Sequence, residues 1–191
     1  MITGVLLAAG RGERFGGDKL RATLPDGRTL VTASAEALVA ALPRVVAVTR
    51  PGDEVVAELL RAAGCTVTVC DRADEGMGAS LACGVAASQA ASGWVIALAD
   101  MPAIRPATIR SVAAHLAAGA RIVTPARDGR GGHPVGFAAE FGPALAALGG
   151  DQGARPIVRA HAADVMRFET DDPGIFHDID TPADLAAPDV D

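Results

Sequence analysis

The sequence predicts an α/β fold in three layers, α/β/α, with a mostly parallel central sheet. Apolar strand-like runs alternate with amphipathic or Ala-rich helical runs, which is typical of a parallel sheet covered by helices on both faces. Half of the 191 residues are hydrophobic and 21% are charged, enough for a sizeable core. We therefore expect one domain over residues 1–191, with right-handed crossover connections.

The predicted elements follow one another closely in the first two thirds of the chain. The strand-like runs are mostly apolar and rich in β-branched residues, and they lie at 4–9, 44–49, 65–70, 94–100 and 120–126. The helical runs that follow the first four strands lie at 29–42, 53–64, 79–91 and 106–118. Gly64 is typical of a helix C-terminus.

The pattern changes after residue 126. A glycine-rich turn at 127–137 enters a short strand, and two helices are expected near 140–148 and 153–162. A strand at 164–168 follows, and 177–185 reads as a strand that leads into a Pro-initiated helix. Ligands bind at the carboxyl ends of strands in such sheets, so the loops at 10–19, 71–80 and 100–105 are expected to gather there.

Composition excludes several classes of function. The net charge is −6, aromatic residues are 3% and tyrosine is absent, which disfavours a nucleic-acid partner. No apolar run approaches the ~20 residues of a membrane span, and the N-terminus lacks the marks of a signal peptide. We therefore expect no membrane partner and a cytoplasmic location.

The spacing of the three cysteines indicates neither a metal site nor a redox motif. Cys65, Cys70 and Cys83 are odd in number, unclustered and without metal-ligand spacing. We expect all three to be reduced and to pack as small core residues.

The stretch "LLAAGRGERFGGDK", residues 6–19, follows the first strand and has three phosphate-binding interpretations. A dinucleotide fingerprint, GxGxxG, fails because Phe15 occupies the third glycine position. A P-loop fails because Asp18 stands where its lysine belongs. A dehydrogenase is therefore the least favoured hypothesis.

The third interpretation is a long loop of pattern LAAGxGxRxGxxK. Its glycines allow backbone N–H groups to turn toward a triphosphate, and the planar fork of Arg14 suits phosphate oxygens. Lys19 is the only lysine among the 17 Lys and Arg residues, and it offers a compact point charge that an arginine does not. The alternative is a solvated loop with charges placed by chance.

Five stretches together carry a family resemblance: "LLAAGRGERFGGDKL", "GMGASLACG", "LADMP", "GGHPVGF" and "DIDTPADL". Over residues 4 to about 187 the chain resembles the MobA-like nucleotidyltransferases of molybdenum-cofactor synthesis. The resemblance implies a Rossmann-like nucleotidyltransferase fold and transfer of a nucleotide to a phosphorylated acceptor, with release of pyrophosphate. Ala9 in "LAAG", where the guanylyl branch reads LAGG, favours CTP over GTP.

The resemblance also implies a nucleotide site and a catalytic group. The first loop and Ser80 would hold the nucleotide, through Leu7, Ala8, Ala9, Gly10, Arg11, Gly12, Arg14, Lys19 and Ser80. The catalytic residues would be Arg14, Lys19, Asp100 and Asp180. For Ser80, the alternative is a plain N-terminal helix residue.

Carboxylates supply the expected metal site. Asp100 projects from the end of the strand at 94–100, and Mg²⁺ favours one or two carboxylates together with substrate phosphates. Asp178 and Asp180 point the same way if they lie on a strand, and the resemblance places the second Mg²⁺ ligand at Asp180. The alternative is that Asp100 and Asp180, or Thr181, only cap the helices that follow them.

The acceptor side is implied by two later loops. Gly132, His133 and Pro134 would border the acceptor phosphate, and Asp151 with Arg155 would hold the acceptor. His133 is expected to be an exposed loop histidine that contacts substrate rather than a general base; the alternative is a hydrogen-bonding or surface group. The alternative for the second loop is a turn with a helix cap.

These expectations converge on a Mg²⁺-dependent transfer of CMP from CTP to a phosphorylated acceptor, with molybdopterin as the leading candidate. The alternatives are GTP with molybdopterin, or another nucleoside triphosphate with a sugar phosphate. A catalytically silent nucleotide- or cofactor-binding protein is an alternative from another class. The finished cofactor would pass to a molybdoenzyme or a chaperone.

Overall fold

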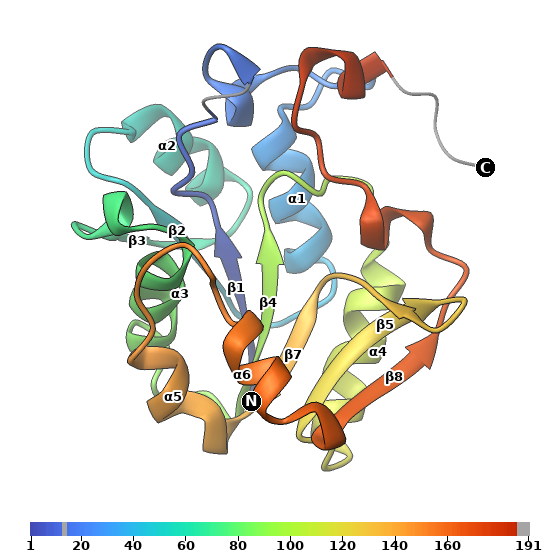
Figure 1. The fold of residues 1–191 in the computed structure, drawn as a ribbon. Helices are drawn as coiled ribbons and strands as arrows, with labels where there is room; N and C mark the ends of the chain where they lie inside the picture. The colour runs from blue at the N-terminus through green and yellow to red at the C-terminus, as the bar shows by residue number, and fades with distance from the viewer. Residues whose placement is uncertain (13–14, 187–191) are drawn as a thin grey trace.

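A single mixed sheet runs through the computed structural model, which describes residues 1–12 and 15–186 (Figure 1). The strand order is β3-β2-β1-β4-β7-β5-β6, and β8 pairs with β5. The strands are β1 (Ile2–Leu7), β2 (Val45–Thr49), β3 (Thr66–Val69), β4 (Gly93–Leu98), β5 (Ile122–Arg127), β6 (Arg130–Gly131), β7 (Val135–Ala138) and β8 (Val165–Glu169).

The first half of the sheet is parallel, as predicted. Strand β1 pairs in parallel with β2 and with β4, and β2 pairs in parallel with β3. Strand β7 then runs antiparallel between β4 and β5, so the sheet is mostly parallel rather than entirely so. The carboxyl ends of β1, β2, β3 and β4 therefore meet at one edge.

Helices cover both faces, which confirms the three layers. They are α1 (Leu30–Val39), α2 (Glu54–Ala62), α3 (Met77–Ala86), α4 (Pro106–Ala117), α5 (Gly142–Ala146) and α6 (Arg155–Ala160). Side chains alternate along β1: Leu6 packs in the core under α1, α2 and α4, whereas Val5 packs in the core under α3 and α5.

One expected strand is absent. Residues 177–181 form no strand; Ile179 N–H donates to the carbonyl of Asp100 at 2.9 Å, and the chain then turns into a 3₁₀ helix at Pro182–Ala186. The prediction that Asp178 and Asp180 share one face of a strand was therefore wrong. An apolar residue between polar neighbours indicates a buried side chain. Here Ile179 is buried beside the loop that follows β4, and it does not join the sheet.

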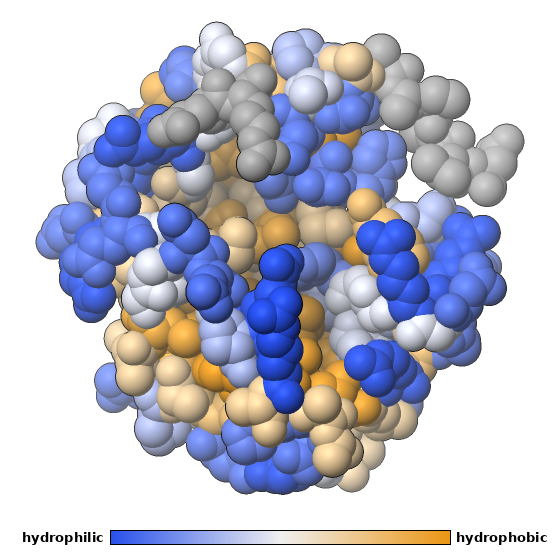
Figure 2. Space-filling model, viewed as in Figure 1, coloured by the Kyte–Doolittle hydropathy of each residue, from blue (hydrophilic) through white to orange (hydrophobic). Residues whose placement is uncertain are grey.

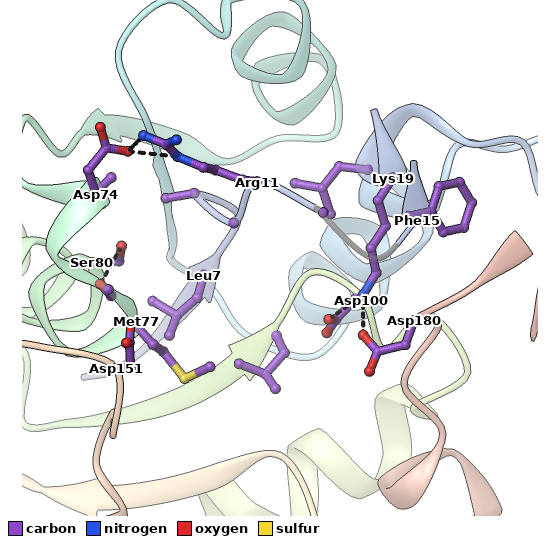
Figure 3. Close-up of a pocket in the computed structure, with 17 residues that line it drawn as sticks. Leu7, Arg11, Phe15, Lys19, Asp74, Met77, Ser80, Asp100, Asp151 and Asp180 are labelled. Carbon is purple, nitrogen blue, oxygen red and sulfur yellow. Dashed lines mark hydrogen bonds and ion pairs between the residues drawn. The ribbon is translucent and has the colours of Figure 1, made fainter. Parts of the chain in front are cut away.

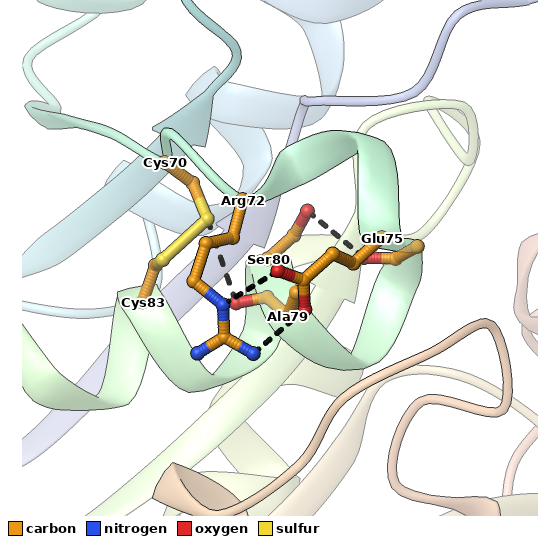
Figure 4. The surroundings of a disulfide bond; sticks show 7 residues. Cys70, Arg72, Glu75, Ala79, Ser80 and Cys83 are labelled. Atoms are coloured by element: carbon orange, nitrogen blue, oxygen red, sulfur yellow. Dashed lines mark hydrogen bonds and ion pairs between the residues drawn. A yellow bond between two sulfur atoms is a disulfide. The ribbon is translucent and has the colours of Figure 1, made fainter.

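The cysteine prediction was also wrong. Cys70, directly after β3, forms a disulfide with Cys83 of α3, with the Cα atoms 5.9 Å apart (Figure 4). The crossover folds α3 back over the end of β3, so residues 13 apart meet without any sequence motif. Cys65 is free and buried, and burial raises the pKa of its thiol to about 11.

Over the described ranges, no helix has both the length and the apolar character needed to cross a bilayer.

Candidate active site

A cleft of about 680 Å³ opens where the parallel strands end, within the size range of small-molecule sites. Figure 2 shows the hollow with an apolar floor and a hydrophilic rim. The first loop, the start of α3 and the end of β4 meet here, as the topology requires. The lining residues are Leu7, Ala9, Gly10, Arg11, Gly12, Phe15, Lys19, Leu20, Ala73, Asp74, Gly76, Met77, Ser80, Leu98, Asp100, Asp151 and Asp180.

The centre of the cleft is an ammonium between two carboxylates (Figure 3). Lys19 Nζ donates to Asp100 Oδ2 at 2.9 Å and to Asp180 Oδ1 at 2.8 Å. The Lys19 side chain is 9% exposed, whereas those of Asp100 and Asp180 are 27% and 41% exposed. Residues from three distant parts of the chain thus form one charged cluster.

Both local structure and charge hold Lys19 in place. The Lys19 N–H donates to the Gly17 carbonyl at 2.8 Å, and a Cβ on Gly12 would lie 2.8 Å from Lys19 Cβ. Gly12 also has φ +61°, so glycine is required there twice over. Burial lowers the pKa of Lys19, but the hydrogen bonds to Asp180 and Asp100 outweigh it and raise the pKa above its ordinary value.

The carboxylates fit a magnesium ion. Asp100 Oδ1 is buried and has no hydrogen-bond partner, so one carboxylate oxygen remains available for a cation. Within residues 1–12 and 15–186, no cluster of three or more His, Cys, Asp or Glu side chains forms a metal cage. Two carboxylates with the other positions left to phosphates and water is the usual arrangement for Mg²⁺.

Asp100 and Asp180 do not cap the helices that follow them, because other carboxylates accept the N–H groups at those helix starts. The Asp184 carboxylate accepts from Thr181 N–H at 2.7 Å and from Asp180 N–H at 3.0 Å, so Asp184 caps the last turn. Asp172, which the sequence analysis missed, accepts from Arg105 N–H at 2.8 Å at the start of α4. The side chains of Asp100 and Asp180 therefore point to Lys19 rather than to helix ends.

The rest of the predicted nucleotide site is partly assembled. Leu7, Ala9, Gly10 and Arg11 line the cleft, while Ala8 has its side chain in the core on the opposite face of the sheet. Arg11 forms a 2.6 Å ion pair with Asp74, a residue that sequence reasoning missed although it lies in the 71–80 loop. Arg14 lies outside the described residues.

Ser80 is buried at the start of α3 and lines the cleft. Its hydroxyl donates to the Gly76 carbonyl at 3.4 Å, a bond back to the preceding turn that is weak by its length. Both interpretations of Ser80, as a helix residue and as a ligand group, are therefore compatible with its position.

The predicted acceptor residues separate into two places. Asp151 lines the cleft, whereas Gly132, His133, Pro134 and Arg155 do not. His133 is not the exposed loop residue that was expected, because its Nδ1 is buried without a hydrogen-bond partner. Burial lowers the pKa of His133, and the positive charge of Arg155 acts in the same direction, against the opposing fields of Asp100 and Asp178.

Comparison with known proteins agrees with this geometry. The MobA-like NTP transferase domain matches residues 4–165. The chain is 34% identical over 190 residues to the nicotine blue oxidoreductase of Paenarthrobacter nicotinovorans, covering 94% of this chain and 92% of that protein.

Two solved structures share the fold over almost the whole chain. A nucleotidyl transferase from Methanothermobacter has 28% identity and a TM-score of 0.83, covering 97% of this chain and 94% of that one. Rv0371c from Mycobacterium tuberculosis has 29% identity and a TM-score of 0.81, covering 97% and 95%. Rv0371c was also solved in complex with manganese. By its matched domain and its fold, this chain belongs to the MobA-like NTP transferase family of nucleotidyltransferases.

Proposed function

We propose that this nucleotidyltransferase transfers CMP from CTP to a phosphorylated acceptor, molybdopterin, and releases pyrophosphate. The observation that carries the proposal is the cluster of Lys19, Asp100 and Asp180 at the carboxyl edge of the sheet. Phosphoryl transfer depends mainly on positioning and on neutralising charge, and this cluster supplies a cation and two metal-binding carboxylates in one cleft.

Lysine suits this position better than arginine. An ammonium has three N–H donors, and two of them go to Asp100 and Asp180. The third remains for a phosphate oxygen of the nucleotide, so Lys19 links the carboxylates to the triphosphate. A planar guanidinium favours paired contacts with one acceptor group and does not reach three separate acceptors in this way.

In the proposed reaction, an oxygen of the acceptor phosphate attacks the α-phosphorus of CTP in line. A new P–O bond forms, and the bond from the α-phosphorus to the pyrophosphate oxygen breaks. Lys19, Arg11, Arg14 and the N–H groups of Gly10 and Gly12 would hold the triphosphate and stabilise the charge of the leaving group. The acceptor phosphate is already an anion at neutral pH, so the reaction needs no strong general base.

Asp100 and Asp180 would hold Mg²⁺. When bound, the ion supplies charge neutralisation for the phosphates during transfer. The buried, unpartnered Oδ1 of Asp100 supports this assignment from the protein side. Manganese in a solved relative supports a divalent metal in the family.

The choice of CTP rests on Ala9, which lines the cleft beside Leu7. The alternative is GTP, or another nucleoside triphosphate with a sugar phosphate. The charges of Arg155 and Asp178 both act on His133. His133 and Arg155, with Gly132 and Pro134, are proposed to border the acceptor phosphate. We propose a cytoplasmic location, and a molybdoenzyme or chaperone as the recipient of the finished cofactor.

A second candidate is an oxidoreductase, because the relative that is 34% identical carries that name. Hydride transfer has no use for the group formed by Lys19, Asp100 and Asp180, and the first loop lacks the dinucleotide fingerprint. Oxidation of NADH or NADPH by the purified chain with nicotine blue as acceptor, without pyrophosphate release, would favour this candidate.

The test is pyrophosphate release from CTP, GTP, ATP and UTP, each with Mg²⁺ and molybdopterin. We expect release with CTP, and a loss of about 100-fold or more in Lys19→Ala, because a preorganised charge contributes on that scale. Release with GTP alone would refute the choice of base. Binding of nucleotide without release from any of the four, in the presence of molybdopterin, would refute molybdopterin as the acceptor and leave two alternatives: a different phosphorylated acceptor, or a protein that binds without catalysing.

A further inference from the structure

Asp151 lies at the end of the cleft away from the charged cluster. Gly76, Met77 and Ser80 line the same end of the cleft. Figure 3 shows Asp151 beside Met77 and below Ser80, with Lys19, Asp100 and Asp180 across the cleft. Asp151 comes from the loop between α5 and α6, far along the chain from α3. Its presence in the cleft is a product of the tertiary fold.

The Asp151 loop is held tightly against the start of α3. Gly78 N–H donates to the Gly150 carbonyl at 2.7 Å. A Cβ on Gly78 would lie 2.5 Å from the Gly149 carbonyl oxygen, and a Cβ on Gly76 would overlap Asp151 Oδ1. Only glycine at both positions lets the loop approach this closely, so the position of Asp151 is built into the fold.

Asp151 is also unlike the other carboxylates of the cleft. Asp74 pairs with Arg11, and Asp100 and Asp180 pair with Lys19. No group in the described part of the chain forms a hydrogen bond or an ion pair with the Asp151 carboxylate. An ionised carboxylate only accepts hydrogen bonds, so its ligand must present a donor.

Charge orients the nucleotide relative to Asp151. An anionic triphosphate is repelled by the unpaired carboxylate of Asp151. The opposite end of the cleft would be net positive once Asp100 and Asp180 hold Mg²⁺ beside the Lys19 ammonium, so the phosphates belong there. The uncharged end of the nucleotide then lies near Asp151, where Leu7, Met77 and Leu98 give an apolar wall for a flat base.

We propose that Asp151 selects nucleotides whose base carries an exocyclic amino group, by accepting a hydrogen bond from that group. The inference rests on the proposed nucleotidyltransferase function and deepens it. A carbonyl at the same place on the base would face the carboxylate as acceptor against acceptor, which disfavours binding. Asp151 is thereby a specificity residue rather than an acceptor-holding one.

The experiment is titration calorimetry of nucleotide binding in the presence of Mg²⁺. It compares CTP with UTP and GTP with ITP, pairs in which only the first member carries the amino group. The proteins are wild type, Asp151→Asn and the matched control Asp171→Asn, a carboxylate that is 93% exposed and does not line the cleft. Asparagine keeps the size of Asp151 and adds an N–H₂ donor that suits a carbonyl.

We expect wild type and Asp171→Asn to bind the amino-bearing member of at least one pair ~10-fold or more tightly, as for a hydrogen bond to a charged group. Asp151→Asn should reduce that preference by ~10-fold or more. An unchanged preference in Asp151→Asn would overturn the inference. A loss of discrimination between CTP and 2′-deoxy-CTP instead would also overturn it, because Asp151 would then contact the ribose.

The two proposals fail separately. Altered base preference without pyrophosphate release would sink the proposed catalysis and leave the role of Asp151 standing. Pyrophosphate release with an unchanged base preference would do the reverse.

Discussion

Replacing Lys19 by methionine tests the central cluster of the cleft. The substitution keeps a long side chain and removes the ammonium that joins Asp100 to Asp180 at 2.9 and 2.8 Å. Breaking a fully buried ion pair costs ~3–5 kcal/mol. Here the carboxylates are 27% and 41% exposed and regain some hydration, so we expect a loss of ~1–3 kcal/mol in metal-free buffer.

For a chain of this size, ~1–3 kcal/mol corresponds to a fall in Tm of roughly 2–12 °C. Mg²⁺ or Mn²⁺ should restore the stability of Lys19→Met, because a dication replaces the ammonium between the same two carboxylates and stabilises only the folded state. Wild type should respond less to the metal, since Lys19 Nζ already bonds Asp100 Oδ2 and Asp180 Oδ1 and partly neutralises the two carboxylates whose other oxygens would bind the ion.

The assay is urea denaturation in EDTA and across a Mg²⁺ titration. Arg21→Met is the matched control. Lys19 and Arg21 lie in one short 3₁₀ helix, Lys19–Arg21, and Arg21 forms an exposed ion pair with Asp18. That pair should contribute only ~0–1 kcal/mol. If Lys19→Met proves as stable as Arg21→Met, or gains no more from metal than wild type does, the cluster does not have the role assigned to it.

Three further outcomes follow from the geometry. The pKa of Lys19 is raised, so its contribution to stability is fully present below pH 10.5 and is lost as pH rises through the folded-state pKa. The difference in unfolding free energy between wild type and Lys19→Met should therefore become smaller above pH 10.5, and a difference that stays constant would contradict this. Asp172→Ala should lower the free energy of unfolding in urea by ~2–4 kcal/mol, because the fully buried carboxylate accepts hydrogen bonds from Arg105 N–H, Thr108 Oγ1 and Gly174 N–H. A change below ~1 kcal/mol would mean that these donors find other partners. Iodoacetamide should not alkylate Cys65 in the native protein at pH 8, since a thiol pKa of about 11 leaves little thiolate. The denatured chain should yield one thiol before reduction and three after it, and three thiols before reduction would contradict the disulfide.

Most of the parallel part of the sheet was predictable because β1, β2 and β4 are buried on both faces. β1, β2 and β4 appear in the sequence as continuous apolar runs, and the structure keeps them within a few residues of the expected limits. β7 was expected as a short strand, but its antiparallel place between β4 and β5 was not. A side-chain pattern reports which faces are buried, and it carries no information about which strand lies alongside.

The errors have a common origin. Residues 177–181 look like a strand because Ile179 is apolar between polar neighbours, yet Ile179 is buried by packing against the loop after β4. His133 looks exposed because it follows glycines, yet its ring nitrogen is buried. Cys70 and Cys83 look unrelated because no motif spans them, yet the crossover brings them together.

By itself, the sequence determined the local elements, the glycine-rich loop that ends in Lys19, and the chemistry of the side chains at the carboxyl edge. Local conformation and residue type depend on neighbours in the chain, which a sequence displays directly. Only the tertiary structure decided which distant groups meet: Lys19 with Asp180 across 161 residues, and Asp151 with the start of α3. Those contacts depend on strand order and on glycines that permit close approach, and their free energy exists only once the elements have packed.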